Sequence, residues 1–261
     1  MKYIDVHAHV FPDDVAPKVV AQLEGYYKMK WHGNGTFADL NKSIEESAVV
    51  KTVIFSTATK PTQVETINNY ISSLCKSSDK FIGFGTMHPD YPDVEQEIAR
   101  FSSLGLKGLK LHPDFQAFNI DDPKMFRIYE AVGSTMPILI HTGDENSDFS
   151  APRRLAAVLD RMPELVFIAA HFGGYCQWEE AKKHLIGRKN LYIDTSSCFH
   201  KISFEEAKEL TRLHGADRVL FASDYPGVRQ NEAIQHILQM GLTPEENELI
   251  FCKNAEKLLG I

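Results

Sequence analysis

Two histidines near the amino terminus have the spacing of a metal-binding pair. His7 and His9 end a short apolar run that begins at Tyr3. On a β-strand, residues i and i+2 point to the same side, so both imidazoles can hold one cation from one direction. A catalytic zinc-type site takes about three protein ligands, usually histidine nitrogens and carboxylate oxygens, and leaves a position for water. The pair therefore predicts metal chemistry if other segments supply the remaining ligands.

Short β-rich runs alternate with helix-period segments along the whole chain. The spacing of about 25–30 residues is that of a βαβ step, and several runs are apolar at nearly every position, as strands covered on both faces should be. The expected strands are 2–10, 51–56, 81–86, 105–111, 137–140, 165–170, 191–194 and 218–222. Eight such units predict an α/β fold, a (β/α)8 TIM barrel that forms a single domain over residues 1–261.

The competing architecture is an open, doubly wound sheet. That fold usually places a glycine-rich phosphate turn after its first strand. The corresponding segment, His9 to Asp13, contains no glycine. No linker or low-complexity tract divides the chain, which favours the single barrel.

Composition narrows the possible partners and the compartment. The net charge is −7, and no basic cluster goes beyond pairs such as Arg153-Arg154, so nucleic acid is not expected as a partner. The four cysteines lie far apart and form no disulfide framework. No stretch approaches 18 apolar residues, and the first residues do not resemble a signal peptide. We expect a cytoplasmic protein with a small-molecule substrate and no membrane contact; no motif specifies a homo-oligomer.

Polar residues gather where the predicted strands end, which is where barrel enzymes carry their chemistry. Six of the eleven histidines lie at these positions. Asp224 follows the eighth strand, which neighbours the first in a closed barrel. We therefore expect Asp224 beside His7 and His9, close enough to bind the metal and to accept a proton from metal-bound water. The other histidines at strand ends are His88, His112, His141 and His171.

The fourth strand carries two further candidates for substrate binding. Lys110 and His112 share one face, and they point into the barrel if Leu109 and Leu111 face the helices. Lys110 has three interpretations: it pairs with a substrate carboxylate, balances a buried acid, or bridges two metals after carboxylation. His112 either anchors a turn or lines the substrate pocket.

Other polar residues after the strands carry less weight. Asp114, Gln116, Asp144 and Glu145 either contact substrate or are solvated loop residues, and we favour solvated positions for most of them. Asp194 follows the seventh strand, and a place in the pocket and a place outside it are equally compatible with the sequence.

Four motifs together resemble the amidohydrolase superfamily. The most similar branch is the amidohydrolase-related one that includes aminocarboxymuconate-semialdehyde decarboxylase and the resorcylate decarboxylases. The resemblance spans nearly the whole chain, and all four motifs occur in order at expected strand ends. They are Asp5-Val6-His7-Ala8-His9, Ile140-His141-Thr142-Gly143, Ala170-His171-Phe172-Gly173-Gly174 and Ala222-Ser223-Asp224-Tyr225-Pro226.

The resemblance implies roles for these residues. His7, His9, His141 and Asp224 would hold a divalent metal, most often zinc, and Asp224 would also accept a proton. His171 would lie beside the metal water as a general acid/base or substrate-polarising group. Some branches carry a carboxylated lysine on the strand of Lys110, but the context of that residue does not match them, which favours one ion.

Three functions are compatible with this pattern. The leading hypothesis is a metal-dependent hydrolase that attacks a lactone, amide or cyclic carboxylic acid with metal-activated water. The second is a metal-dependent, non-oxidative decarboxylase, which would use the same ligands. The third is a barrel that binds metal without turnover; burying so many polar groups at one mouth without a function argues against it.

Overall fold

All residues, 1–261, are described by the structure, a computed structural model. Its strands are parallel and follow chain order in two ladders, β1 to β3 and β4 to β9. The strands are β1 (Tyr3–His9), β2 (Val49–Phe55), β3 (Phe81–Gly83), β4 (Gly85–Thr86), β5 (Leu109–Leu111), β6 (Ile138–Ile140), β7 (Phe167–Ala169), β8 (Leu191–Asp194) and β9 (Val219–Leu220).

Backbone hydrogen bonds join the two ladders into a ring. β3 and β4 are halves of the third expected strand, interrupted at Phe84, whose N–H donates to the carbonyl of Ile54 at 3.0 Å. On the other side, the N–H of Val6 donates to the carbonyl of Phe221 at 3.0 Å, and that of Asp224 donates to the carbonyl of His7 at 2.8 Å. The chain is thus a single-domain α/β fold with a closed eight-stranded barrel, which confirms the predicted fold class.

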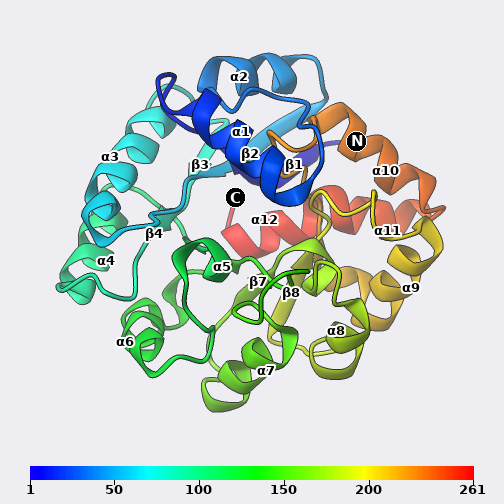
Figure 1. Cartoon of the computed structure of the whole chain (residues 1–261). Helices are drawn as coiled ribbons and strands as arrows, with labels where there is room; N and C mark the ends of the chain where they lie inside the picture. Colours follow the sequence, from blue (N-terminus) through cyan, green and yellow to red (C-terminus); the bar gives the residue numbers. More distant parts are fainter.

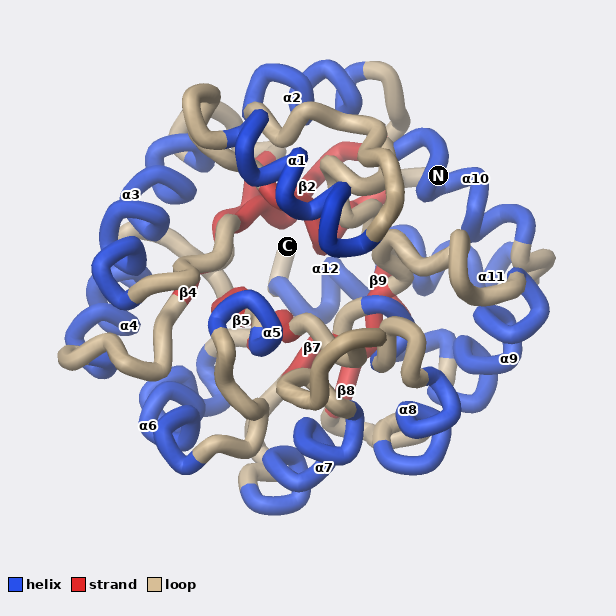
Figure 2. Tube along the Cα trace, viewed as in Figure 1, coloured by secondary structure: helices blue, strands red, loops and turns tan.

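Helices surround the strands, as Figures 1 and 2 show. None of them is both long and apolar enough to cross a lipid bilayer. The α-helices are α1 (Ala16–Tyr27), α2 (Phe37–Glu45), α3 (Val64–Cys75), α4 (Val94–Ser103), α5 (Pro113–Gln116), α6 (Pro123–Val132), α7 (Pro152–Arg161), α8 (Trp178–His184), α9 (Phe204–His214), α10 (Gln230–Gln239), α11 (Pro244–Glu248) and α12 (Asn254–Leu259). Shorter turns are η1 (Pro61–Gln63), η2 (Gly133–Thr135), η3 (His171–Gly173), η4 (Ala216–Arg218) and the π-helical η5 (Leu249–Lys253).

Two apolar clusters make up the core. The larger, of 55 buried residues, lies between the strands and the helices. The smaller, of 12, fills the barrel interior with side chains such as Val53, Leu139 and Ile168 from the middle of their strands. Cys252 and Ala255, from η5 and α12, belong to the smaller cluster, so the carboxyl-terminal segment closes the end of the barrel away from the site.

β1 contains a bulge that aims its histidines. Asp5 pairs with Thr52 and Ala8 with Ile54, so three steps along β1 match two along β2. An extra residue in one strand shifts the later side chains to the other face. Val6 can therefore pack inside the barrel while His7 and His9 also face inward, toward its mouth.

The long segment after β1 forms two helices. In Figure 1, α1 lies in front of the strands, whereas α12 lies behind them. The Tyr26 hydroxyl at the end of α1 donates to Asp144, at 3.1 and 3.0 Å from its two carboxylate oxygens, and the Tyr27 hydroxyl lies 3.3 Å from Nε2 of His112. This segment therefore covers part of the barrel mouth.

His214, at the end of α9, is a buried histidine held in its neutral form. Its Nε2 donates to the carbonyl of Leu191 at 2.9 Å, and its Nδ1 accepts from the N–H of Gly187 at 3.2 Å. Burial lowers the pKa of His214 from 6.5 to about 4. His214 therefore binds a proton near pH 6.5 in the unfolded chain but only near pH 4 in the folded chain.

We expect this residue to make the fold less stable in mild acid. The contribution of neutral His214 to the free energy of unfolding is complete above pH 6.5. It is lost as the pH falls toward 4, at up to about 1.4 kcal/mol per pH unit. Urea unfolding at several pH values measures how steeply the free energy of unfolding changes with pH, and this dependence should be weaker in His214→Gln, which keeps a donor and an acceptor. Equal slopes for the two proteins would contradict the assignment.

Candidate active site

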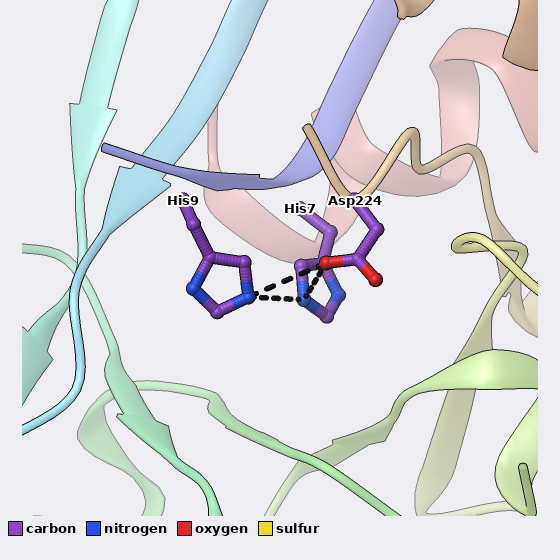
Figure 3. Close-up of side chains that lie close together, drawn as sticks. All are labelled: His7, His9 and Asp224. Atoms are coloured by element: carbon purple, nitrogen blue, oxygen red, sulfur yellow. Dashed lines mark hydrogen bonds and ion pairs between the residues drawn. The ribbon is translucent and has the colours of Figure 1, made fainter. Parts of the chain in front are cut away.

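Three side chains converge at the carboxyl end of the barrel strands, as Figure 3 shows. His7 and His9 come from β1 and Asp224 from the loop after β9. Nε2 of His7 lies 3.3 Å from Nε2 of His9, and Oδ1 of Asp224 lies 3.2 and 3.3 Å from these two nitrogens. Tetrahedral ligands at about 2.0–2.1 Å from an ion stand roughly 3.3–3.4 Å apart. The three atoms therefore have the spacing of ligands to one metal ion.

Asp194, at the end of β8, orients the first of these ligands. Nδ1 of His7 donates to the Asp194 carboxylate at 2.9 Å, which leaves the Nε2 lone pair of His7 directed at His9 and Asp224. Burial alone would raise the pKa of Asp194, but its contacts with His7 outweigh burial and lower it to about 2. A carboxylate behind a ligating histidine fixes the tautomer and the ring orientation. The sequence left the role of Asp194 open, and its geometry is that of a positioning residue.

A second carboxylate network positions Asp224. The N–H and hydroxyl of Ser223 donate to Asp5 at 2.9 and 2.6 Å, and Gln230 donates to the same carboxylate at 3.1 Å. The Ser197 hydroxyl donates to Oδ2 of Asp224, so Oδ1 remains free to face the histidines. These contacts tie the start of the chain to the loop after the last strand.

The protonation states of His7, His9 and Asp224 favour the binding of a cation. Burial would raise the pKa of Asp224, but the adjacent His7 and His9 hold it well below its usual range. Burial lowers the pKa of His9 to about 4, so its imidazole is neutral at pH 7. For His7, burial and Lys110 act to lower the pKa, but Asp224 and Asp194 outweigh them and raise it. A metal ion bound at Nε2 of His7 would replace that proton.

Lys110 points into the barrel, as predicted, and it contacts the site directly. Its side chain is fully buried, and Nζ lies 3.1 Å from Nε2 of His7 and 4.9 Å from the centre of the Phe55 ring. Burial lowers the pKa of Lys110 to about 8. Its nearest polar neighbour is thus an imidazole of the group and not a carboxylate.

Three of the four other predicted histidines, His112, His141 and His171, form a row beside His7, whereas Nδ1 of His88 accepts from the N–H of Asp90. The ring centres of His7 and His171 are 5.7 Å apart, those of His171 and His141 4.7 Å, and those of His141 and His112 4.0 Å. Burial lowers the pKa of all three later histidines below 6.5. Nδ1 of His141 faces Nε2 of His171 at 3.0 Å. His141 therefore lies at the same mouth, but it is not within ligand spacing of the His7 group.

A small cavity opens beside these residues. Its volume of about 10 Å³ is room for roughly one water. Long loops supply Met29, Ser197 and His200, residues that carry no strand-end signal in the sequence. The lining residues are Tyr27, Met29, Trp31, His141, His171, Tyr175, Ser197, His200 and Asp224.

The chain has the fold of several solved structures. One is a 2,6-dihydroxybenzoate decarboxylase in complex with 2,6-dihydroxybenzoate, 17% identical with a TM-score of 0.79 over 100% of both chains. Another is a protein from Pseudomonas putida assigned as a 2-pyrone-4,6-dicarboxylic acid hydrolase, 17% identical with a TM-score of 0.72 over 99% of this chain and 97% of that one. A third is a D314N variant of a 5-carboxyvanillate decarboxylase from Novosphingobium aromaticivorans with bound manganese, 18% identical with a TM-score of 0.72 over 99% and 97%.

At these identities the likeness shows the shared fold. A search among curated proteins gave no match. The sequence does match the model of a protein family described as Amidohydrolase, over residues 4–261. That match covers all four motifs and the side chains that converge at the barrel mouth. The chain therefore belongs to the amidohydrolase family and is an enzyme.

Proposed function

We propose that the protein is a metal-dependent hydrolase of a small organic substrate, a lactone, an amide or a cyclic carboxylic acid. The observation that carries this proposal is the spacing of 3.2–3.3 Å between the ligand atoms of His7, His9 and Asp224. His7, His9 and Asp224 would hold a divalent metal, zinc in our proposal, which would supply a Lewis acid for a carbonyl and would lower the pKa of water from ~15.7 toward ~7.

The surrounding side chains move protons and orient the ligands. Oδ1 of Asp224 is placed to accept a proton from a water at the group, because Oδ2 is already bonded to Ser197. Asp194 holds His7 in the tautomer that presents Nε2. Nδ1 of His171 donates to the carbonyl of Ser196, so Nε2 has a lone pair that can take up a proton at the side that faces the cavity; once protonated, it can donate to a developing oxyanion. His141 as a fourth ligand stays a prediction.

Non-oxidative decarboxylation is the second candidate. Two of the compared structures are of decarboxylases, and the same ligands serve either reaction. In that reaction the protonated form of Asp224 or His171 would deliver a proton to carbon, while Lys110 offers a buried ammonium for a substrate carboxylate.

Isotope labelling separates these two reactions. Metal-reconstituted protein is incubated with a panel of lactones, cyclic amides and hydroxylated aromatic acids in H₂¹⁸O, and products are analysed by mass spectrometry. Hydrolysis places one ¹⁸O in the product, whereas decarboxylation releases CO₂ and leaves the product without solvent oxygen. Turnover of an aromatic acid with CO₂ release and no label would reject hydrolysis in favour of decarboxylation.

Metal removal tests the requirement for an ion. Dialysis against a chelator should abolish turnover, because His7, His9 and Asp224 alone supply no polarising charge for a carbonyl. Adding back Zn²⁺ or Mn²⁺ should restore it. A metal-free protein that keeps full activity, with metal content checked by mass spectrometry, would disprove metal dependence.

A further inference from the structure

The segment between β1 and β2 covers polar side chains that the sequence favoured as solvated. Asp144 is 2% exposed and accepts from the Tyr26 hydroxyl, and Gln116 is 4% exposed. The side chain of Asp114 is 1% exposed. For these three residues the preference for solvated positions was wrong, because α1 and the neighbouring loops cover them. Trp31 follows α1 on the same segment and is itself buried, with 9% of its surface exposed.

The backbone around Trp31 is anchored at two points. The N–H of Trp31 donates to the Glu24 carboxylate in α1 at 2.9 Å. The N–H of Gly33 donates to the carbonyl of Pro226 at 2.9 Å, in the loop that begins at Asp224. Trp31 is therefore fixed between α1 and the loop that carries a candidate metal ligand.

The indole ring of Trp31 has a defined orientation. The Tyr27 ring lies nearly parallel to it, at an interplanar angle of 22° and with the ring centres 6.5 Å apart. A Cβ added to Gly227 would lie 3.8 Å from Cε2 of Trp31, the carbon that is bonded to Nε1. The nitrogen-bearing edge of the ring thus lies near the loop after Asp224.

Nε1 of Trp31 is a buried donor that has no hydrogen-bond partner in the chain. The nitrogen of an indole can donate but cannot accept. Trp178, the second of the two tryptophans, shows the usual arrangement, because its Nε1 donates to the carbonyl of His171 at 3.0 Å. Buried donors are normally paired, and an unpaired one is unfavourable. Trp31 can therefore donate to a bound molecule without breaking an existing bond.

Trp31 and Asp224 line the same cavity at the barrel mouth. Two hydroxyls of this lining already have partners. The Ser197 hydroxyl donates to Asp224, and the Tyr175 hydroxyl lies 3.0 Å from Nε2 of His200. A molecule that enters the cavity thus meets Nε1 of Trp31 as a fixed and uncommitted N–H, close to the group of the proposed reaction.

We propose that Trp31 binds the substrate, by donating a hydrogen bond from Nε1 to a carbonyl or carboxylate oxygen. The inference rests on the proposed function, since it takes the barrel mouth as the substrate site, and it adds the residue that recognises an oxygen there. A donor that is already held in place loses little freedom on binding. A substrate without such an oxygen leaves the N–H unpaired, so Trp31 discriminates against it.

Nuclear magnetic resonance tests the contact without a known substrate. Protein labelled with ¹⁵N has two indole N–H signals, and the signal missing from Trp31→Phe is that of Trp31. Zn²⁺-loaded protein is titrated with acetate, a small carboxylate, and separately with acetamide, a neutral carbonyl compound. We expect the Trp31 proton signal to move downfield and to saturate with at least one of the two probes.

The second tryptophan is the internal control for this titration. The Trp178 signal should move less, because its N–H is already bonded. Sodium chloride at the same ionic strength should move neither signal. Acetate without acetamide would assign the site to carboxylates, and both together to any carbonyl oxygen. A Trp31 signal that stays in place with both probes would mean that only water meets the donor, and this result overturns the proposal.

Kinetics tests the same contact during turnover. With a substrate found by the labelling assay, Trp31→Phe should raise KM about three- to tenfold, because one neutral hydrogen bond is lost. It should change kcat less than about twofold and leave the metal content unchanged, because the contact is made before and during the reaction alike. Tyr91→Phe, which removes a surface hydroxyl that donates to Glu65, is the control and should keep its KM. An unchanged KM in Trp31→Phe contradicts the proposal.

The two measurements distinguish this proposal from the proposed function. A shifted Trp31 signal without turnover of any lactone or amide would support the oxygen contact and refute hydrolysis. Hydrolysis with a normal KM in Trp31→Phe and an unmoved signal would refute the contact and leave the proposed hydrolase intact.

Discussion

Asp224→Asn should lower turnover about 10³-fold while the protein still binds metal. The amide keeps one oxygen that can face the ion, and its NH₂ can donate to the Ser197 hydroxyl oxygen where the carboxylate accepted from it. It has no basic oxygen to take a proton from water, and general acid/base groups contribute about 10²–10⁴-fold. The loss is expected for hydrolysis and decarboxylation alike, because both need a proton moved at this position. Steady-state kinetics with measured metal content gives the result.

A matched variant controls for the loss of one negative charge. Asp217→Asn removes an exposed carboxylate in η4, just before β9, that pairs with Arg218 on the surface. Its turnover should equal that of the unchanged protein. Full activity in metal-loaded Asp224→Asn would remove Asp224 from the mechanism, even if the metal site itself survived.

Gly143→Ala should be severely destabilising, at about 3 kcal/mol. Gly143 has a φ of +82°, and a Cβ there would lie 2.5–2.6 Å from backbone atoms of Gly174 and Tyr175. The left-handed conformation costs about 1–2 kcal/mol for a residue with a side chain, and overpacking adds about 1–3. The clash is with backbone, so it can be relieved only by separating the loops after β6 and β7. Urea unfolding measures the loss.

Gly260→Ala provides the comparison. Gly260 follows α12 in the left-handed conformation, with φ 65° and ψ 41°, but nothing lies within 4 Å of an added Cβ. It should therefore lose only the conformational part, about 1 kcal/mol. Because Tyr175 lines the cavity, Gly143→Ala should also impair turnover, and Gly260→Ala should not. Similar losses of stability in both variants would show that the close approach at Gly143 is not what matters.

The barrel and the mouth of the site could be predicted because both follow from local patterns. Apolar runs at regular spacing define the strands, and parallel strands bring all their carboxyl ends to one side. Ring closure then places Asp224 beside His7 and His9, which the structure shows at 3.2–3.3 Å. These inferences need only the order and direction of the strands.

Features that depend on side-chain packing were not predictable in this way. The bulge in β1 adds one residue to the register and leaves no mark in the residue types. Burial of Asp114 depends on the segment between β1 and β2 folding over the mouth, and this segment lies far from it in sequence. The contact between Asp194 and His7 joins opposite parts of the chain, so strand order alone did not settle it.

The network that ties Asp5 to Ser223 joins residues 218 positions apart, at the seam where the barrel closes. During synthesis on the ribosome, His7 and His9 emerge early, while their carboxylate partner is among the last parts of the chain to be made. A growing polypeptide can thus offer an ion only two imidazoles from this group. If these three residues hold the metal as we propose, tight loading has to wait until translation has passed Asp224 and the final strand has docked, and an enzyme truncated before that point would lack its metal.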